Sequence, residues 1–164
     1  MKKLLLSIIS TAFIFALSTN AEHKNAKDFD YKLVNSKGRK TKPDLKNKEY
    51  IVLYYSASWC PPCQKFTPKL VDFYNEVQKD KGSKMNFEVI FVSSDRSKGS
   101  MKKYMKNKKM PWPAIAYKKK QKIKTVMKNA PSGIPHIVIL GKNGEATFAG
   151  SANAGLSKLK TLAK

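Results

Sequence analysis

Apolar residues dominate three short runs, which predict buried β-strands. The runs cover residues 50–55, 87–92 and 137–140. They are rich in β-branched and aromatic residues, and mainly apolar runs of this length are typical of strands buried on both faces. Weaker patterns predict a short strand at 31–34 and a strand at 146–149 that returns from an Asn-Gly hairpin turn.

Segments with helical spacing separate these strands. Apolar residues three and four positions apart predict a helix that starts at Pro61 and ends near Gly82. Shorter periodic segments predict helices around 101–105, 123–127 and 156–162. Because strands alternate with helices, we expect parallel β-α-β units, and the closing hairpin adds an antiparallel strand. The pattern predicts one α/β domain: a central mixed sheet flanked by helices.

Ahead of that domain, which we assign to residues 31–164, lies a segment with the features of an export signal. A pair of lysines precedes an uncharged apolar run, and small residues up to Ala21 suit a signal peptidase. The run is shorter than the roughly 18–20 residues that cross a bilayer. We expect residues 1–21 to be a cleaved signal peptide, residues 22–30 to be a flexible leader, and the protein to be periplasmic or secreted. An uncleaved anchor or a buried core helix is the alternative.

The chain is strongly basic. Lys and Arg number 33 against 11 Asp and Glu, which gives a net charge of +22, while a hydrophobic content of 41% excludes global disorder. Lysine runs at 102–109 and 118–128 are typical of solvated helix faces. No nucleic-acid motif accompanies them, so we expect no specific nucleic-acid partner. Steering of acidic protein substrates, or adhesion to anionic envelope surfaces, fits this charge better.

The two cysteines form a Cys-x-x-Cys pair between a strand and a helix start. At a helix N-terminus, free N–H groups and the macrodipole favour an anion, so the Cys60 thiolate should be more populated than that of a free cysteine with a pKa of about 8.5. Cys63 lies one helical turn later and can attack a mixed disulfide formed by Cys60. Pro61 and Pro62 suit the first helical positions, donate no N–H and stiffen the turn. The pattern predicts that Cys60 attacks and Cys63 resolves.

Three alternatives to a redox role of the pair remain open: a static structural disulfide, a metal site and chance spacing. A metal site would need further ligands, and only His23 and His136 could join the two cysteines as nitrogen donors. We therefore expect no metal and no cofactor apart from the redox-active Cys60–Cys63 disulfide itself.

Four motifs occur along the chain in a recognisable order. They are Trp-Cys-Pro-Pro-Cys at 59–63, Phe-Thr-Pro at 66–68, Met-Pro-Trp at 110–112 and Gly-Ile-Pro at 133–135. Together they resemble the thioredoxin superfamily and, within it, the nucleoredoxin and tryparedoxin branch. The resemblance implies a thioredoxin fold with an N-terminal β extension, and thiol–disulfide oxidoreductase activity in cell redox homeostasis.

The resemblance also implies roles for individual residues. Cys60 would be the nucleophile and Cys63 the resolving thiol. Trp59 would shield the sulfur pair and offer a docking face. Pro135 would be cis and would expose the backbone of Ile134 to an extended substrate chain, because an X-Pro bond is the one peptide bond for which cis costs little.

Departures from the family pattern concern the handling of protons. Tyr54 stands where thioredoxins carry a buried aspartate, as it does in tryparedoxins. Asp95 lies in a Ser-Asp-Arg loop, where tryparedoxins have Trp-Asp-Glu, and Gln64 replaces the usual Arg, so reduction by trypanothione is not implied. His136 follows Pro135 and has an unperturbed pKa of about 6.5. Tyr54, Asp95 and His136 are the candidate proton handlers, each set against a purely structural role.

We therefore expect an exported, monomeric thiol–disulfide oxidoreductase that exchanges disulfides with protein partners. A reductant role is favoured because Ile134, before the proline, is the thioredoxin-like residue; a membrane or envelope electron donor would then be required. Two alternatives remain: a dedicated reductant of apocytochrome c thiols, and a non-catalytic basic binding module with a structural disulfide.

Overall fold

The computed structural model describes residues 21–80, 82–83 and 85–164, so all but the last residue of the expected signal peptide lies outside the described residues. Six strands form one sheet in the order β1-β4-β3-β2-β5-β6. The strands are β1 (Leu33–Val34), β2 (Tyr50–Ser56), β3 (Phe87–Ser93), β4 (Ala114–Ile115), β5 (His136–Gly141) and β6 (Ala146–Ser151). The three strongest apolar runs thus occupy β2, β3 and β5.

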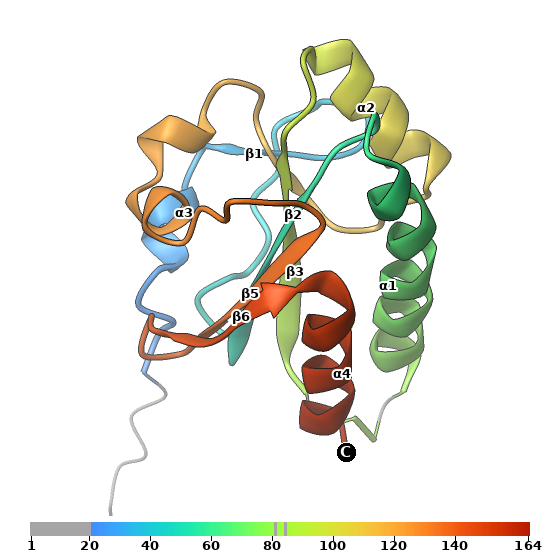
Figure 1. Cartoon of the computed structure of the whole chain (residues 1–164). Helices are drawn as coiled ribbons and strands as arrows, with labels where there is room; N and C mark the ends of the chain where they lie inside the picture. Colours follow the sequence, from blue (N-terminus) through green and yellow to red (C-terminus); the bar gives the residue numbers. More distant parts are fainter. Residues whose placement is uncertain (1–20, 81, 84) are drawn as a thin grey trace, which may run out of the picture.

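Helices cover both faces of this sheet (Figure 1). The α-helices are α1 (Pro61–Lys79), α2 (Lys98–Asn107), α3 (Lys124–Lys128) and α4 (Ala152–Leu162), and the 3-10 helices are η1 (Ala26–Phe29) and η2 (Lys120–Lys122). The predicted fold class, a mixed sheet flanked by helices with an added N-terminal strand at its edge, is confirmed.

The prediction of parallel β-α-β units is correct for β2 and β3 but wrong for β5. β2 and β3 run parallel across α1, but β5 runs antiparallel to β2, with His136 opposite Tyr55. A parallel crossover must carry the chain back to the other end of the sheet. At about 1.5 Å per residue, a helix as short as α3 cannot do so. The chain therefore enters β5 from the end at which β2 finishes.

The core has two halves because successive side chains of a strand point to opposite faces of a sheet. Val52 and Tyr54 of β2 face the half covered by α1, α2 and α4. Ile51, Leu53 and Tyr55 face the half covered by η1 and α3. We call these halves the α1 face and the α3 face.

Residues 22–30, expected to be a flexible leader, are packed onto the α3 face. Phe29 and His23 are each 2% exposed. The backbone N–H of Lys24 donates to the carbonyl of Lys142 at 3.0 Å. The segment has two apolar residues in a single 3-10 turn, which is too little for a visible period, yet they cover part of the sheet.

Within the described residues, no helix combines the length and apolar character needed to span a bilayer.

Candidate active site

The redox pair lies where β2 ends and α1 begins. Cys60 occupies the N-cap position with extended backbone, and α1 continues for 19 residues behind it. Pro61 and Pro62 fill the first two helical positions and have no N–H to offer. The N–H of Cys63 therefore reaches back to the Cys60 sulfur, at 3.3 Å. The cysteine sulfur takes the place that a serine or aspartate oxygen usually takes in capping a helix.

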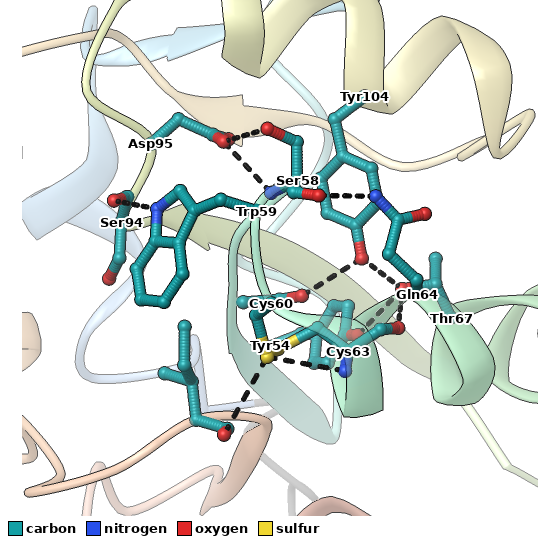
Figure 2. The surroundings of a disulfide bond; sticks show 12 residues. Tyr54, Ser58, Trp59, Cys60, Cys63, Gln64, Thr67, Ser94, Asp95 and Tyr104 are labelled. Carbon is teal, nitrogen blue, oxygen red and sulfur yellow. Dashed lines mark hydrogen bonds between the residues drawn. A yellow bond between two sulfur atoms is a disulfide. The ribbon is translucent and has the colours of Figure 1, made fainter.

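Cys60 and Cys63 are joined in a disulfide, with their Cα atoms 5.2 Å apart. Cys63 is fully buried, whereas Cys60 keeps 4% of its surface exposed. Of the two cysteines, Cys60 is thus the one that keeps some surface exposed to solvent. Figure 2 shows it between the helix start and a carbonyl oxygen from the loop before β5.

That carbonyl belongs to Ile134 and lies 3.8 Å from the Cys60 sulfur. The Ile134–Pro135 peptide bond is cis, as the resemblance implied. The Ile134 side chain also packs against the small cluster of Ala57, Cys60 and Cys63. The loop before β5 thus forms one wall of the site.

Trp59 forms the exposed side of the site. Its side chain is 55% exposed, and its indole N–H donates to the carbonyl of Ser94 at 3.1 Å. The hydrogen bond holds the ring against the end of β3 while its face remains open to solvent (Figure 2).

Asp95 connects the two segments that meet at this corner. One carboxylate oxygen accepts from the backbone N–H of Ser58 at 2.8 Å and from its hydroxyl at 2.6 Å. The other accepts from the Ser93 hydroxyl at 2.8 Å. The carboxylate therefore ties the loop before Cys60 to the end of β3. This arrangement supports a positioning role for Asp95, and proton transfer by it stays a prediction.

Beneath Cys63 lies a buried network of hydroxyl groups. Thr67, one turn further along α1, donates to the carbonyl of Cys63 at 2.8 Å. Its oxygen then accepts from the hydroxyls of Tyr54 at 2.8 Å and Tyr104 at 2.6 Å. Ser56 completes the network with a 3.1 Å hydrogen bond to Tyr104. Burial raises the pKa of Tyr54, so its phenol stays protonated and remains a donor.

His136 lies on the α3 face, away from this network. It pairs with Tyr55 across the strands, with ring centroids 6.4 Å apart. Desolvation lowers its pKa, so the ring is neutral at neutral pH. Of the three candidate proton handlers, Tyr54 and Asp95 thus hydrogen-bond to residues of the active-site corner, while His136 packs on the opposite face.

A sequence profile of the thioredoxin-like family matches residues 47–146, which contain the whole site. The chain belongs to the thioredoxin-like family. It is 38% identical over 123 residues to probable nucleoredoxin 1 of Arabidopsis thaliana, across 73% of this chain and 19% of that protein. It is 36% identical over 114 residues to nucleoredoxin of Bos taurus, across 69% of this chain and 25% of that protein.

Solved structures agree with this assignment. Thioredoxin of Wuchereria bancrofti superposes with a TM-score of 0.63 at 30% identity, covering 79% of this chain and 94% of that one. Tryparedoxin I of Leishmania major gives 0.64 at 28% identity, covering 79% and 86%. The Cys60–Cys63 pair therefore lies in a thioredoxin-like oxidoreductase domain. The chain spans only about a fifth to a quarter of the two nucleoredoxins it matches.

Several residues of this thioredoxin-like site were not found by sequence reasoning. Ser58 and Ser93 hold Asp95, and Thr67 and Tyr104 build the hydroxyl network. The amide of Gln64 donates to the carbonyl of Ser58. Thr67 carried a usable signal, since it follows Cys63 by one helical turn. Tyr104 carried none, because it reads as an ordinary core position of α2.

Among the described residues, no group of three or more His, Cys, Asp or Glu side chains is arranged to hold a metal ion. His23 is buried on the α3 face, where its ring lies 3.4 Å from the Leu140 carbonyl. The expectation of a site without metal or organic cofactor stays a prediction.

Proposed function

We propose that the protein is an exported thiol–disulfide oxidoreductase that reduces disulfides in protein partners. One observation carries this proposal: the sulfur of Cys60, the cysteine that keeps some surface exposed, caps α1 and receives the Cys63 N–H at 3.3 Å. When the pair is reduced, that N–H and the helix dipole stabilise negative charge on the Cys60 sulfur. A stabilised thiolate at an accessible position is the nucleophile that disulfide exchange needs.

The exchange proceeds in two steps. The Cys60 thiolate attacks one sulfur of the substrate disulfide, and the other substrate sulfur leaves as a thiolate that takes up a proton. The Cys63 thiol loses its proton and attacks the Cys60 sulfur, which releases the second substrate thiol and restores the Cys60–Cys63 disulfide. Two electrons pass to the substrate, and a dithiol donor in the membrane or envelope must return them.

The finer parts of the proposal rest on sequence. The apolar segment ending at Ala21 supports export to the periplasm or medium. Ile134 before the cis proline supports the reducing direction. We propose a monomer that needs no metal, no organic cofactor and no nucleic acid.

Insulin reduction driven by dithiothreitol tests the activity. Cys60→Ser should lower the rate to that of dithiothreitol alone, because the attacking sulfur is lost. Cys63→Ser should accumulate mixed disulfides, because the second step is blocked. If the natural protein reduced insulin no faster than dithiothreitol alone and Cys63→Ser trapped no mixed disulfide, only a basic binding module with a structural disulfide would remain.

Two further measurements test the reactivity of Cys60, the proposed location of the protein and the proposed direction of the exchange. Alkylation of the reduced protein should show that Cys60 reacts faster at neutral pH than a cysteine in an unstructured peptide. Fractionation of cells should place the mature chain outside the inner membrane, and trapping its thiols there should find the pair mostly reduced. A mostly oxidised pair contradicts the reductant role without contradicting disulfide exchange.

A further inference from the structure

A pocket of about 210 Å³ lies beside the disulfide, between α3 and the loop before β5. Ile134 lines this pocket, and its carbonyl oxygen is also the one that lies 3.8 Å from the Cys60 sulfur. Ser94 lines it too, and its carbonyl holds the Trp59 indole. We call it the side pocket. The side pocket thus shares Ile134 and Ser94 with the surroundings of the disulfide.

The side pocket is lined mainly by apolar side chains, together with Ser94, Lys120 and Gln121. The apolar side chains include those of Tyr55, Val92, Val126, Met127, Ala130 and Ile134. Met127 in this lining is 49% exposed, and Trp59, next to Cys60 in the chain, is 55% exposed. Exposed apolar side chains gathered around a reactive group are typical of a surface that a partner covers.

Residues 118–128, which supply Lys120, Gln121, Val126 and Met127 to the lining of the side pocket, form a strongly basic segment. Between residues 118 and 128 the chain has six lysines and no acidic residue. We call the lysines of this segment the basic rim: Lys118, Lys119, Lys120, Lys122, Lys124 and Lys128. All except Lys120 are exposed. Lys120 lines the side pocket itself, whereas Lys124 and Lys128 line another pocket.

Two members of the basic rim are bound within the protein. The amino group of Lys120 donates to the Ser93 carbonyl at 3.2 Å, and Lys128 pairs with Glu145 at 3.3 Å. The other four lysines are exposed, and the segment contains no acidic residue, so it attracts an anionic partner.

We propose, on the basis of the redox function above, that the side pocket and the basic rim dock an acidic, extended segment of the substrate protein beside its disulfide. One apolar side chain of the segment fills the pocket, and its carboxylates lie along the lysines. The substrate is then a protein whose disulfide is flanked by acidic residues and one apolar residue.

A polypeptide fits these features better than a nucleic acid does. The pocket adjoins the Cys60 sulfur, and a polypeptide supplies a disulfide for that sulfur to attack together with an apolar side chain for the pocket. Nucleic acid supplies phosphate charge for the lysines but no disulfide. Binding of nucleic acid at this surface is accordingly an outcome of the test.

Two synthetic peptides test the proposal with the full chain. Both contain the same disulfide and the same neighbouring leucine, and they differ in having only Glu or only Lys at the remaining flanking positions. The second-order rate constant of their reduction by the reduced protein is measured at low and at high salt. A small uncharged disulfide, 2-hydroxyethyl disulfide, is measured alongside as a check on the redox function itself.

We expect the Glu peptide to react at least about tenfold faster at low salt, because complementary charge raises the encounter rate. The advantage should shrink severalfold at about 0.5 M salt, where charges are screened. The double variant K119E/K122E should lose most of it. The matched control K158E/K160E makes the same change in net charge on exposed positions of α4, on the α1 face, and should keep most of it.

The pocket is tested separately through its apolar wall. Replacing leucine by glycine in the Glu peptide should lower the rate severalfold with the natural protein. With Met127→Ser the same replacement should matter less, because the pocket has lost part of its apolar surface.

Each contrary result has a distinct meaning. Equal rates for the two peptides, or an equal loss in K119E/K122E and K158E/K160E, overturn the acidic docking surface while the reduction of 2-hydroxyethyl disulfide upholds the redox function. Failure to reduce any of the three disulfides overturns the redox function. Competition by a single-stranded oligonucleotide at concentrations where polyglutamate does not compete assigns the rim to nucleic acid and overturns the proposal.

Discussion

The two faces of the sheet are packed with different kinds of side chain. The α1 face is aromatic, and its rings contact one another at centroid distances between 5.4 and 6.4 Å. The rings are those of Tyr54, Phe66, Phe73, Tyr74, Phe87, Phe91, Tyr104 and Trp112. The α3 face is mainly aliphatic, with Leu33, Ile51, Leu53, Ile90, Val138 and Leu140 at its centre.

The elements that cover these faces differ as well. α1 has 19 residues and holds the disulfide at its start, whereas α3 has five and η1 has four. The difference separates two tasks. The aromatic face and its hydroxyl network hold the redox pair in one geometry, while the short covering elements of the other face bear the exposed lysines proposed to meet the substrate.

The largest expected effect on stability comes from truncating one large buried side chain on each face and comparing the two losses. Trp112 is 1% exposed, with its ring against Tyr54 and Tyr74, so Trp112→Ala should lower the free energy of unfolding by about 3–5 kcal/mol. Ile123→Ala beside α3 should cost about 2 kcal/mol, because a five-residue helix can relax around the gap. Guanidinium denaturation measures both. Equal losses would contradict the contrast between the faces.

A second contrast concerns buried tyrosine hydroxyls. Tyr104→Phe removes hydrogen bonds to both Ser56 and Thr67, and should lower the free energy of unfolding by about 1–3 kcal/mol. Tyr55→Phe on the α3 face removes a single hydrogen bond to the Val126 carbonyl and should cost about 1 kcal/mol. Urea titrations of the two variants give the comparison, and a larger loss in Tyr55→Phe would refute it.

Asp95 lies where the two faces meet at the end of β3. Asp95→Asn replaces charge-assisted hydrogen bonds to Ser58 and Ser93 by neutral ones, a change of about 1 kcal/mol in holding the loop before Cys60. The rate of insulin reduction should therefore fall about fivefold. The exposed Asp72→Asn on α1 is the matched control and should leave the rate unchanged.

For Asp95, a further readout distinguishes positioning from proton transfer. If the carboxylate only positions the loop, Asp95→Asn should lower the rate by the same factor at every pH. A variant whose pH profile loses one ionisation would instead assign proton transfer to Asp95.

The smallest expected effect tests the packing of residues 22–30. Burial lowers the pKa of His23, the charge of Lys142 lowers it further, and the hydrogen bond to Leu140 opposes both. Since the folded-state pKa lies below the unfolded value of about 6.5, the neutral ring stabilises the fold above that pH and the stability is lost as pH falls below it. His23→Asn should therefore lose less stability than the natural protein between about pH 7.5 and about pH 5.

His136 also has a lowered pKa, but it is present in both proteins, so its contribution cancels in this difference. Identical pH dependence of the two unfolding free energies would show that residues 22–30 are not packed in solution as they are in the structure.

The sequence predicted the strongest elements well and the weakest poorly. The runs that became β2, β3 and β5 each lie within a residue or two of the observed strand. β4, of two residues, gave no signal because Pro111 and Pro113 precede it and its apolar residues are too few for a pattern. η1 was missed because it too is short.

The residues of the candidate site also fall into those that the sequence could place and those that it could not. Cys60, Cys63 and the two prolines between them could be placed from sequence, because capping of a helix depends on residues within one turn. The partners of Asp95 could not, since Ser58 lies 37 residues away along the chain. The role of His136 was left open for the same reason. Its position became clear only from the pairing of β5 with β2, which directs the His136 side chain to the α3 face.

By itself, the sequence determined the main strands, the long helix and the place of Cys60 at its start, since periodicity and helix capping act over a few residues. Tertiary structure alone decided the direction of β5, the burial of His23 and the hydrogen bonds between the Asp95 carboxylate and Ser58. Those contacts join residues far apart in the chain, and only the packing of the whole sheet brings them within reach of one another.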